Sequence, residues 1–150
     1  MIWQLLNTRK SLLLLLIGMF LAKWAATQPV STLLKNAERE AKAGHFLAAA
    51  ELWERAGRLK NSDSDLLHQA GEAYAQGRDY LRAGDCYRAV LTAPKFPLAQ
   101  LRYARALKQQ GRYDEAQQAF EQFAQGYGGE YKAVLLSVAE NEISGCQLAE

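Results

Sequence analysis

Proline, cysteine and histidine are rare in this chain of 150 residues, which contains three prolines, two cysteines and two histidines. So few prolines leave long stretches in which a helix is not interrupted. Alanine, leucine, glutamine, glutamate and arginine dominate after the first 27 residues, and β-branched residues are few. Because the common residues are strong helix formers, the composition predicts an all-α protein.

The chain also lacks a large excess of either charge, with 18 basic and 16 acidic residues. The first 27 residues contain three of the basic residues, Arg9, Lys10 and Lys23, and no acidic residue, so the remaining body has a formal net charge of −1. Nucleic-acid binding depends mainly on basic side chains that contact phosphates. A near-neutral body therefore predicts no nucleic-acid partner.

The first 27 residues have the pattern of a leader. Arg9 and Lys10 precede an apolar run at 11–22, and small residues follow this run before Gln28. This order is typical of a cleaved signal peptide. An uncleaved membrane anchor is the alternative, although a span needs about 20 apolar residues and Lys23 ends the run early. We expect an exported protein of the periplasm or outer membrane, or an inner-membrane protein if the anchor is retained.

Residues of the same kind recur at a spacing of 33 or 34 along the body. A repeat at this period is the signature of stacked helix pairs. Four columns keep the same register: Phe46, Tyr80 and Tyr113; Ala49, Ala83 and Ala116; Trp53, Tyr87 and Phe120; and Ala37, Gly71 and Ala104.

Each unit is predicted to form a first helix, helix A, a tight turn, and a second helix, helix B. The aromatic and alanine columns share one face of helix B at helical spacing, and the small residue of helix A allows close packing. Gly44 and Gly111 fall at the A–B turn, where a helix C-cap needs a left-handed residue. In the second unit Arg78 occupies that column and Gly77 precedes it.

This pattern resembles the tetratricopeptide repeat. The segments AGHFLAAAELWERA, GRDYLRAGDCYRAV and GRYDEAQQAFEQF resemble its second helices, Gly71 and Tyr74 its first-helix signature, and Pro94 its repeat end. The resemblance implies an α-solenoid of three units followed by a capping helix. A solenoid needs such a cap because each unit buries its faces only against its neighbours.

The predicted domain covers residues 28–150, after a signal peptide or anchor at 1–27. Its repeats are predicted at 30–63, 64–96 and 97–129, and Ser62 or Asp63 is suited to cap the second unit. We expect helices at 30–43, 46–59, 64–77, 80–92, 97–110, 113–125 and 130–143. Val134, Leu135, Val138 and Ala139 are expected to cover the apolar end of the stack.

The third repeat, LRYARALKQQGRYDEAQQAFEQFAQ, resembles more narrowly the N-terminal module of envelope proteins from Bacteroidetes-type bacteria. In those proteins the exported repeats precede a β-propeller and an OmpA-like peptidoglycan-binding domain, and some serve the type nine secretion apparatus. Neither of those domains is present in the 150 residues. The chain is then either a truncated relative or a stand-alone module, and the resemblance implies an envelope scaffold while giving no support to a cell-wall-binding role.

The residues that could support catalysis are scattered. His45 and His68 lie in different repeats and outside any HxxxH or HExxH pattern, so no metal site is predicted. Cys86 and Cys146 are separated by a whole repeat, which argues against an intramolecular disulfide. Cys86 is expected to be a small buried apolar residue, and Cys146 to follow the last helix.

Two further patterns favour structure over chemistry. The glycines of 126–129 lack the Lys-Ser/Thr of a phosphate loop and are interpreted as a helix breaker. The repeat spacing of the aromatic residues predicts core positions rather than a ligand site: Trp53, Tyr74, Tyr80, Tyr87, Tyr103, Tyr113 and Phe120. We therefore expect no enzyme, no cofactor and no metal.

The A helices of such a solenoid line its concave face, which is the expected binding surface for a partner. The resemblance places ten residues on it: Leu34, Glu38, Lys42, His68, Glu72, Gln76, Leu101, Arg105, Lys108 and Gln109. The family's carboxylate clamp of lysine, asparagine and arginine is not carried over, because leucine, histidine and glutamate occupy its columns. A groove that is acidic at its start and basic at its end suits an extended or helical protein segment, although a plain solvated face is the alternative.

The sequence thus predicts an exported scaffold of the cell envelope whose partners are other envelope proteins or peptide segments. Membrane contact is expected only if the leader is retained. A membrane-tethered assembly factor and an accessory subunit of an envelope enzyme are the competing interpretations.

Overall fold

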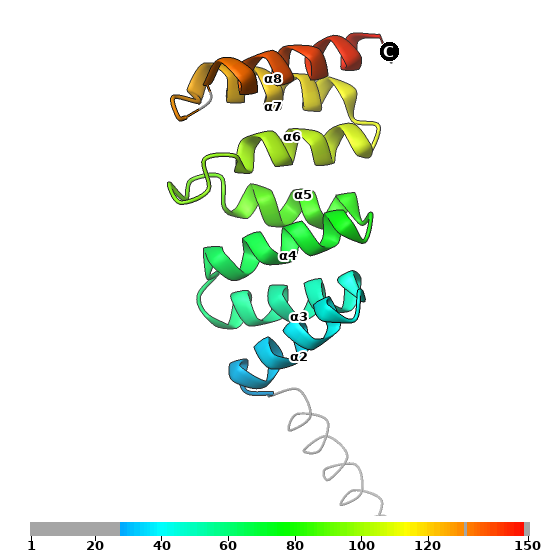
Figure 1. The fold of residues 1–150 in the computed structure, drawn as a ribbon, viewed down its shortest axis with the longest axis vertical. Helices are drawn as coiled ribbons and strands as arrows, with labels where there is room; N and C mark the ends of the chain where they lie inside the picture. The colour runs from blue at the N-terminus through cyan, green and yellow to red at the C-terminus, as the bar shows by residue number, and fades with distance from the viewer. Residues whose placement is uncertain (1–27, 131, 149–150) are drawn as a thin grey trace, which may run out of the picture.

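The computed structural model describes residues 28–130 and 132–148, and this part of the chain forms helices without strands. The predicted leader lies outside the described residues. Each helix packs on the next one along the chain, so the molecule is a single stack that runs from α2 to α8 (Figure 1). The helices are α2 (Val30–Lys42), α3 (Phe46–Leu59), α4 (Ser64–Gln76), α5 (Tyr80–Ala89), α6 (Ala99–Gln109), α7 (Tyr113–Gly126) and α8 (Lys132–Gln147).

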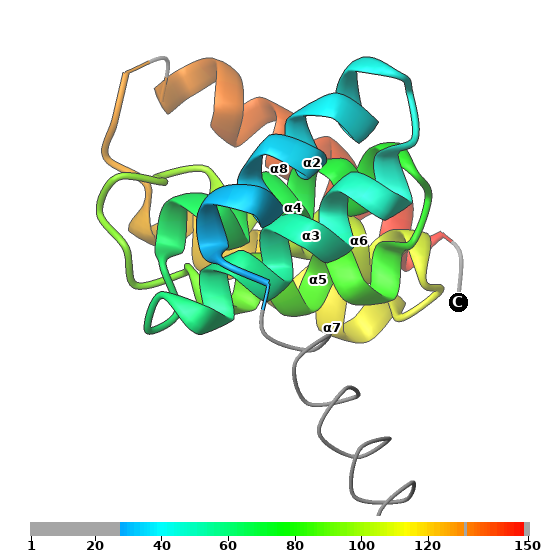
Figure 2. The ribbon, with the colours of Figure 1, turned by 90° about the horizontal axis from the view of Figure 1, so that it is seen from below.

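The predicted alternation of A and B helices is confirmed. The A helices are α2, α4 and α6, and the B helices are α3, α5 and α7. A view along the stack places α5 and α7 toward one side and α2 and α8 toward the other (Figure 2). The all-α solenoid is therefore the observed fold, with α8 packed on α7 at the end of the stack.

The A–B turns show why the repeat carries glycine at one position. Gly44 and Gly111 have φ angles of +80° and +76°, in the left-handed region that favours glycine. In the second unit Arg78 adopts this conformation, with φ +62°, whereas Gly77 stays right-handed at −77°. An added Cβ at position 77 would lie 2.4 Å from Cδ2 of Leu47, so Leu47 would have to move to accept it.

Close packing between helix A and helix B is visible at Gly71. A Cβ built there would lie 2.9 Å from Cε1 of Tyr87 on the following helix. Ala37 and Ala104, which occupy the same column, are fully buried. The prediction that a small residue lets the paired helices approach closely is confirmed.

The aromatic columns contribute to the core to different extents. Tyr74 and Phe120 are fully buried and Tyr87 is nearly so, as predicted. Trp53 and Tyr80 are half-buried, and their remaining surface faces solvent. Tyr103 and Tyr113 are also half-buried and pack against the core. The columns are therefore core residues that leave some aromatic edges exposed.

The helix boundaries differ from the prediction mainly on either side of the loop between α5 and α6. α5 ends at Ala89 instead of 92, and α6 begins at Ala99 instead of 97. The cap of α4 is as expected, because Asp63 Oδ1 accepts hydrogen bonds from the backbone N–H groups of Asp65 and Leu66 at 3.1 and 3.2 Å.

The last helix starts and ends later than predicted, at Lys132 and Gln147. It continues through Ser144 and Gly145 because Cys146 is fully buried against α6 and α7, which extends the apolar contact by one turn. Cys146 thus lies inside α8, not after it as predicted. Cys86, as expected, is a buried member of the core between α4 and α5.

The expectation that four apolar residues of α8 cover the stack holds only in part. Leu135 and Ala139 pack against α6 and α7, and Val138 is half-buried. Val134 is 62% exposed, because it lies on the side of α8 away from this contact.

Candidate binding surface

The surface formed by the A helices, here called the A-face, contains two adjoining hollows. The N-terminal hollow, of about 170 Å³, lies between α2 and α4. The C-terminal hollow, of about 310 Å³, lies between α4 and α6. Both are lined by Glu72 and Gln76 of α4, so they adjoin along this helix. Together they form a depression that extends over the A helices of all three units.

The aromatic columns of the B helices supply the floor of this depression. Phe46 and Trp53 of α3 line the N-terminal hollow, and Tyr80 and Tyr87 of α5 line the C-terminal hollow. These pairs are equivalent in the repeat. Each hollow therefore has an apolar, aromatic base that an inserted side chain could contact.

An ion pair borders the C-terminal hollow. Arg102 of α6 pairs with Glu72 of α4 and so connects successive A helices. The Tyr87 hydroxyl donates a hydrogen bond to Glu72 Oε1 at 2.7 Å. Burial raises the pKa of the Tyr87 phenol, and this hydrogen bond to a carboxylate raises it further, so Tyr87 stays a neutral donor.

His68 lies beside this border rather than inside either hollow. Its ring stacks on Phe96 with centroids 4.1 Å apart and planes 7° from parallel. The side chain is half-buried, and burial lowers the pKa of the imidazole, partly offset by the nearby charge of Glu72. Its position in an aromatic stack, next to Arg102, favours the neutral form.

A second charged cluster lies where α6 meets α8. Arg105 Nε is 3.3 Å from Glu142 Oε1, and Lys108 Nζ is 2.8 Å from Glu142 Oε2. The hydrogen bond to Glu142 raises the pKa of Lys108, which keeps its ammonium group charged at neutral pH. One carboxylate is therefore shared by two cations. Arg105 belongs to this cluster and also lines the C-terminal hollow.

The predicted binding residues are only partly gathered by the fold. Glu72, Gln76, Arg105 and Gln109 line the C-terminal hollow. The remaining ones lie elsewhere: Glu38 and Lys42 are exposed on α2, Leu34 is half-buried against the core, His68 stacks on Phe96, and Lys108 pairs with Glu142. Their role in binding stays a prediction.

Leu101 needs a correction, because it is not on the surface. Its side chain is 3% exposed and belongs to a core cluster that includes Phe120 and Phe123 of α7. The equivalent Leu34 and His68 are half-buried. The column thus becomes more deeply covered toward the C-terminal end of the stack, where α7 and α8 close over α6, and a partner cannot reach Leu101.

Sequence reasoning missed several lining residues. Arg102 lies three residues before Arg105, on the same side of α6, and this helical spacing was the available signal. Ala75 and Ala106 also line the C-terminal hollow. Small residues of this kind give no signal in the sequence, because their place beside a hollow depends on how the helices pack. Glu142 of α8 reaches Arg105 and Lys108 of α6, a contact between residues 34 and 37 positions apart that the sequence reasoning did not consider.

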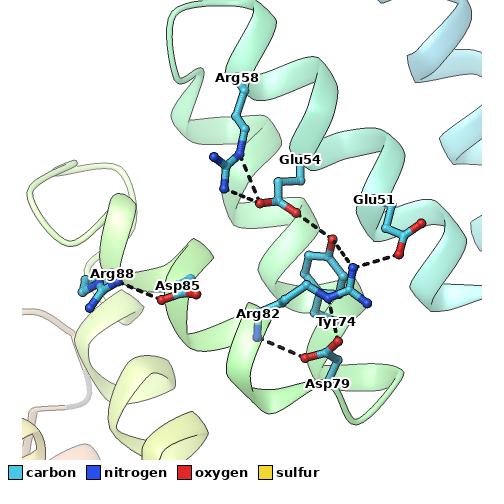
Figure 3. A network of polar contacts seen from close by, with 8 residues as sticks. All are labelled: Glu51, Glu54, Arg58, Tyr74, Asp79, Arg82, Asp85 and Arg88. Carbon is cyan, nitrogen blue, oxygen red and sulfur yellow. Dashed lines mark hydrogen bonds and ion pairs between the residues drawn. The ribbon is translucent and has the colours of Figure 1, made fainter. Parts of the chain in front are cut away.

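Two other depressions are larger but differ in character. One, of about 390 Å³, lies at the loop edge of the stack and is lined by residues of 91–100 and 122–129. The other, of about 430 Å³, lies between α3 and α5 over a network of polar contacts (Figure 3). In that network Tyr74 donates to Glu54 Oε2 at 2.7 Å, and Arg82 contacts Glu51 and Asp79 at 2.8 and 2.6 Å. Because these contacts connect α3 with α4 and α5, the network joins the first two units.

Within residues 28–130 and 132–148, no group of three or more histidine, cysteine or acidic side chains is arranged to hold a metal ion. Over the same residues, none of the helices combines the length and apolar character needed to cross a membrane.

Comparison with known proteins agrees with the fold. Residues 98–125, which correspond to α6 and α7, match the family model for the tetratricopeptide repeat. Curated proteins gave no match. The chain is similar to a solved structure described as the Sgt2 TPR domain from Aspergillus fumigatus, with a TM-score of 0.58 and 17% identity over 81% of this chain and 83% of that chain. The chain is thus a repeat protein of TPR-like fold, and at this identity the likeness concerns the fold alone.

Proposed function

We propose that this repeat protein is an exported scaffold of the bacterial cell envelope, which binds a segment of another protein along its A-face. The observation that carries the proposal is the depression formed by the two adjoining hollows. Its aromatic floor offers apolar contact, and its border offers charged and amide groups for polar contacts. This combination is typical of surfaces that bind peptide segments.

The two glutamines of the depression are suited to contact a peptide main chain. Gln76 and Gln109 are exposed and line the C-terminal hollow, Gln76 being shared by both hollows. Each side-chain amide can donate and accept a hydrogen bond at once, as a peptide group requires. Recognition of this kind depends little on the sequence of the bound segment.

Substitution of Gln76 tests the binding surface directly. Gln76→Trp places a large ring where the hollows meet and should reduce partner binding by about ten-fold or more. Gln118→Trp is the matched control, because Gln118 is also exposed but lies on the B helix α7. Equal binding by both variants would contradict the proposal.

The partner can be identified by photo-cross-linking from Gln109 and, as a control, from Gln118, in the bacterium that makes the protein. We expect envelope proteins to cross-link specifically from Gln109. Recovery of cytoplasmic chaperones alone would count against an envelope scaffold.

Export is supported by the sequence of residues 1–27, with its basic pair, apolar run and following small residues. A tethered assembly factor is the second candidate, since α2 begins at Val30, directly after this leader. Mass spectrometry of the mature protein separates the two. An N-terminus near Gln28 supports the secreted form, and an intact Met1 in the membrane fraction supports the tethered form.

A further inference from the structure

Arg105 is the only residue described here that both lines the C-terminal hollow and contacts Glu142. Its side chain is 49% exposed. A guanidinium carries five N–H donors, and the contact with Glu142 is made through Nε at 3.3 Å, near the upper limit for a hydrogen bond. The outer face of the guanidinium is therefore available to a further carboxylate.

The charges around this point are not balanced. Arg102 pairs with Glu72, while Arg105 and Lys108 share Glu142. Three cations thus meet two carboxylates in these pairs across α4, α6 and α8. The excess positive charge lies at the wall of a hollow whose floor is aromatic, so the surface is complementary to an acidic group close to an apolar one.

We propose that the C-terminal hollow binds a protein segment that carries a carboxylate side chain close to a large apolar side chain, and that Glu142 of α8 competes with this carboxylate for Arg105 and Lys108. The inference rests on the proposed function and specifies the chemistry of its partner. The apolar side chain enters the hollow over Tyr80 and Ala106. The carboxylate binds the outer face of the Arg105 guanidinium, beside Glu142, and weakens the contact between Arg105 and Glu142.

Glu142 and a bound carboxylate would be neighbours of like charge, which costs binding energy. Glu142→Gln keeps the size of the side chain and removes its charge, so acidic segments should bind more tightly. An exposed ion pair is weak, and its loss corresponds to a gain in affinity of about two-fold to five-fold. A gain is diagnostic, because a damaged fold weakens binding.

The experiment uses the full chain in mild detergent and a displayed library of random 12-residue peptides. The best-enriched peptide is synthesised with a fluorophore, together with a version in which Asp and Glu become Asn and Gln. Affinities are measured for the natural chain and for Glu142→Gln and Arg105→Gln. Arg88→Gln is the control, since Arg88 is 62% exposed and pairs with Asp85 on α5.

We expect enriched peptides to combine acidic and large apolar residues. Glu142→Gln should tighten binding of the acidic peptide about two-fold to five-fold, Arg105→Gln should weaken it at least about five-fold, and Arg88→Gln should leave it unchanged. The neutral peptide should not respond to Glu142→Gln.

The selected peptides could lose binding in Gln76→Trp and yet show no enrichment of acidic residues. This result would overturn the inference but leave the proposed function standing. So would an unchanged or weaker affinity of Glu142→Gln. If no selected peptide depends on Gln76, the proposed function fails as well.

Discussion

Replacing Arg78 by glycine should stabilise the protein, although the change removes a whole side chain. Arg78 holds φ at +62°, whereas the equivalent turns at Gly44 and Gly111 carry glycine at +80° and +76°. The hydrogen bonds are the same in all three turns. In the second unit the N–H of Asp79 donates to the carbonyl of Tyr74 at 2.9 Å, as the residue after each glycine does. Only the residue type differs.

The magnitude follows from two opposing effects. A residue with a Cβ in the left-handed region costs about 1–2 kcal/mol, and glycine would relieve this cost. Glycine also makes the unfolded chain more flexible, which costs about 0.5–1 kcal/mol. The expected net gain for Arg78→Gly is therefore about 0.5–1 kcal/mol, or a rise in Tm of about 2–4 °C for a domain of this size.

The assay is urea and thermal unfolding followed by circular dichroism, with Gly111→Arg as the mirror-image variant. A Cβ at Gly111 would meet nothing within 4 Å, so this substitution tests the backbone effect without a steric clash. We expect it to lower stability by a similar amount. If Arg78→Gly lowers Tm while Gly111→Arg does not, the reasoning from the φ angle is refuted.

Two further substitutions test the packing and the electrostatics. Gly71→Ala should cost about 1–3 kcal/mol of unfolding free energy, because its Cβ would lie 2.9 Å from the Tyr87 ring in a tightly packed interior, whereas Gly126→Ala has open space and should be neutral or stabilising. Burial holds the pKa of His68 below its usual 6.5, so the unfolded chain takes up the proton more readily and the fold loses stability as the pH falls through 6.5. The loss of stability between pH 7.5 and 5.5, measured by urea unfolding, should therefore be smaller in His68→Gln, and an equal loss in both proteins would contradict this assignment.

The fold was predictable because the same pattern of residue types occurs in each of the three units. An aromatic column at positions 46, 80 and 113 and a small residue at 37, 71 and 104 specify one helix pair. Turn chemistry and helix caps agree with this pattern, and agreement across levels is what allows one sequence to specify one structure. The second turn shows the limit, since its glycine, Gly77, is right-handed and the left-handed position is occupied by Arg78.

The binding surface was harder to predict because burial does not repeat with the sequence. Leu34, His68 and Leu101 share one column, yet only Leu101 is in the core. Its burial depends on contacts with residues of α7 and α8, which the repeated column itself does not encode. For the same reason no pattern in the sequence connects Glu142 with Arg105.

The contacts of Glu38, Glu72 and Arg105, which share one column of the repeat, change how this charged column is interpreted. The sequence suggested a groove that changes from acidic to basic, but most of these charges are already used. Glu72 joins α4 to α6 through Arg102, and Arg105 joins α6 to α8 through Glu142. A partner that binds the A-face through charge must therefore compete with contacts that hold the stack together. Exposed ion pairs contribute only about 0.2–1 kcal/mol each, so breaking one of them costs the fold little stability. The specificity of binding then depends on which internal ion pair a ligand can replace.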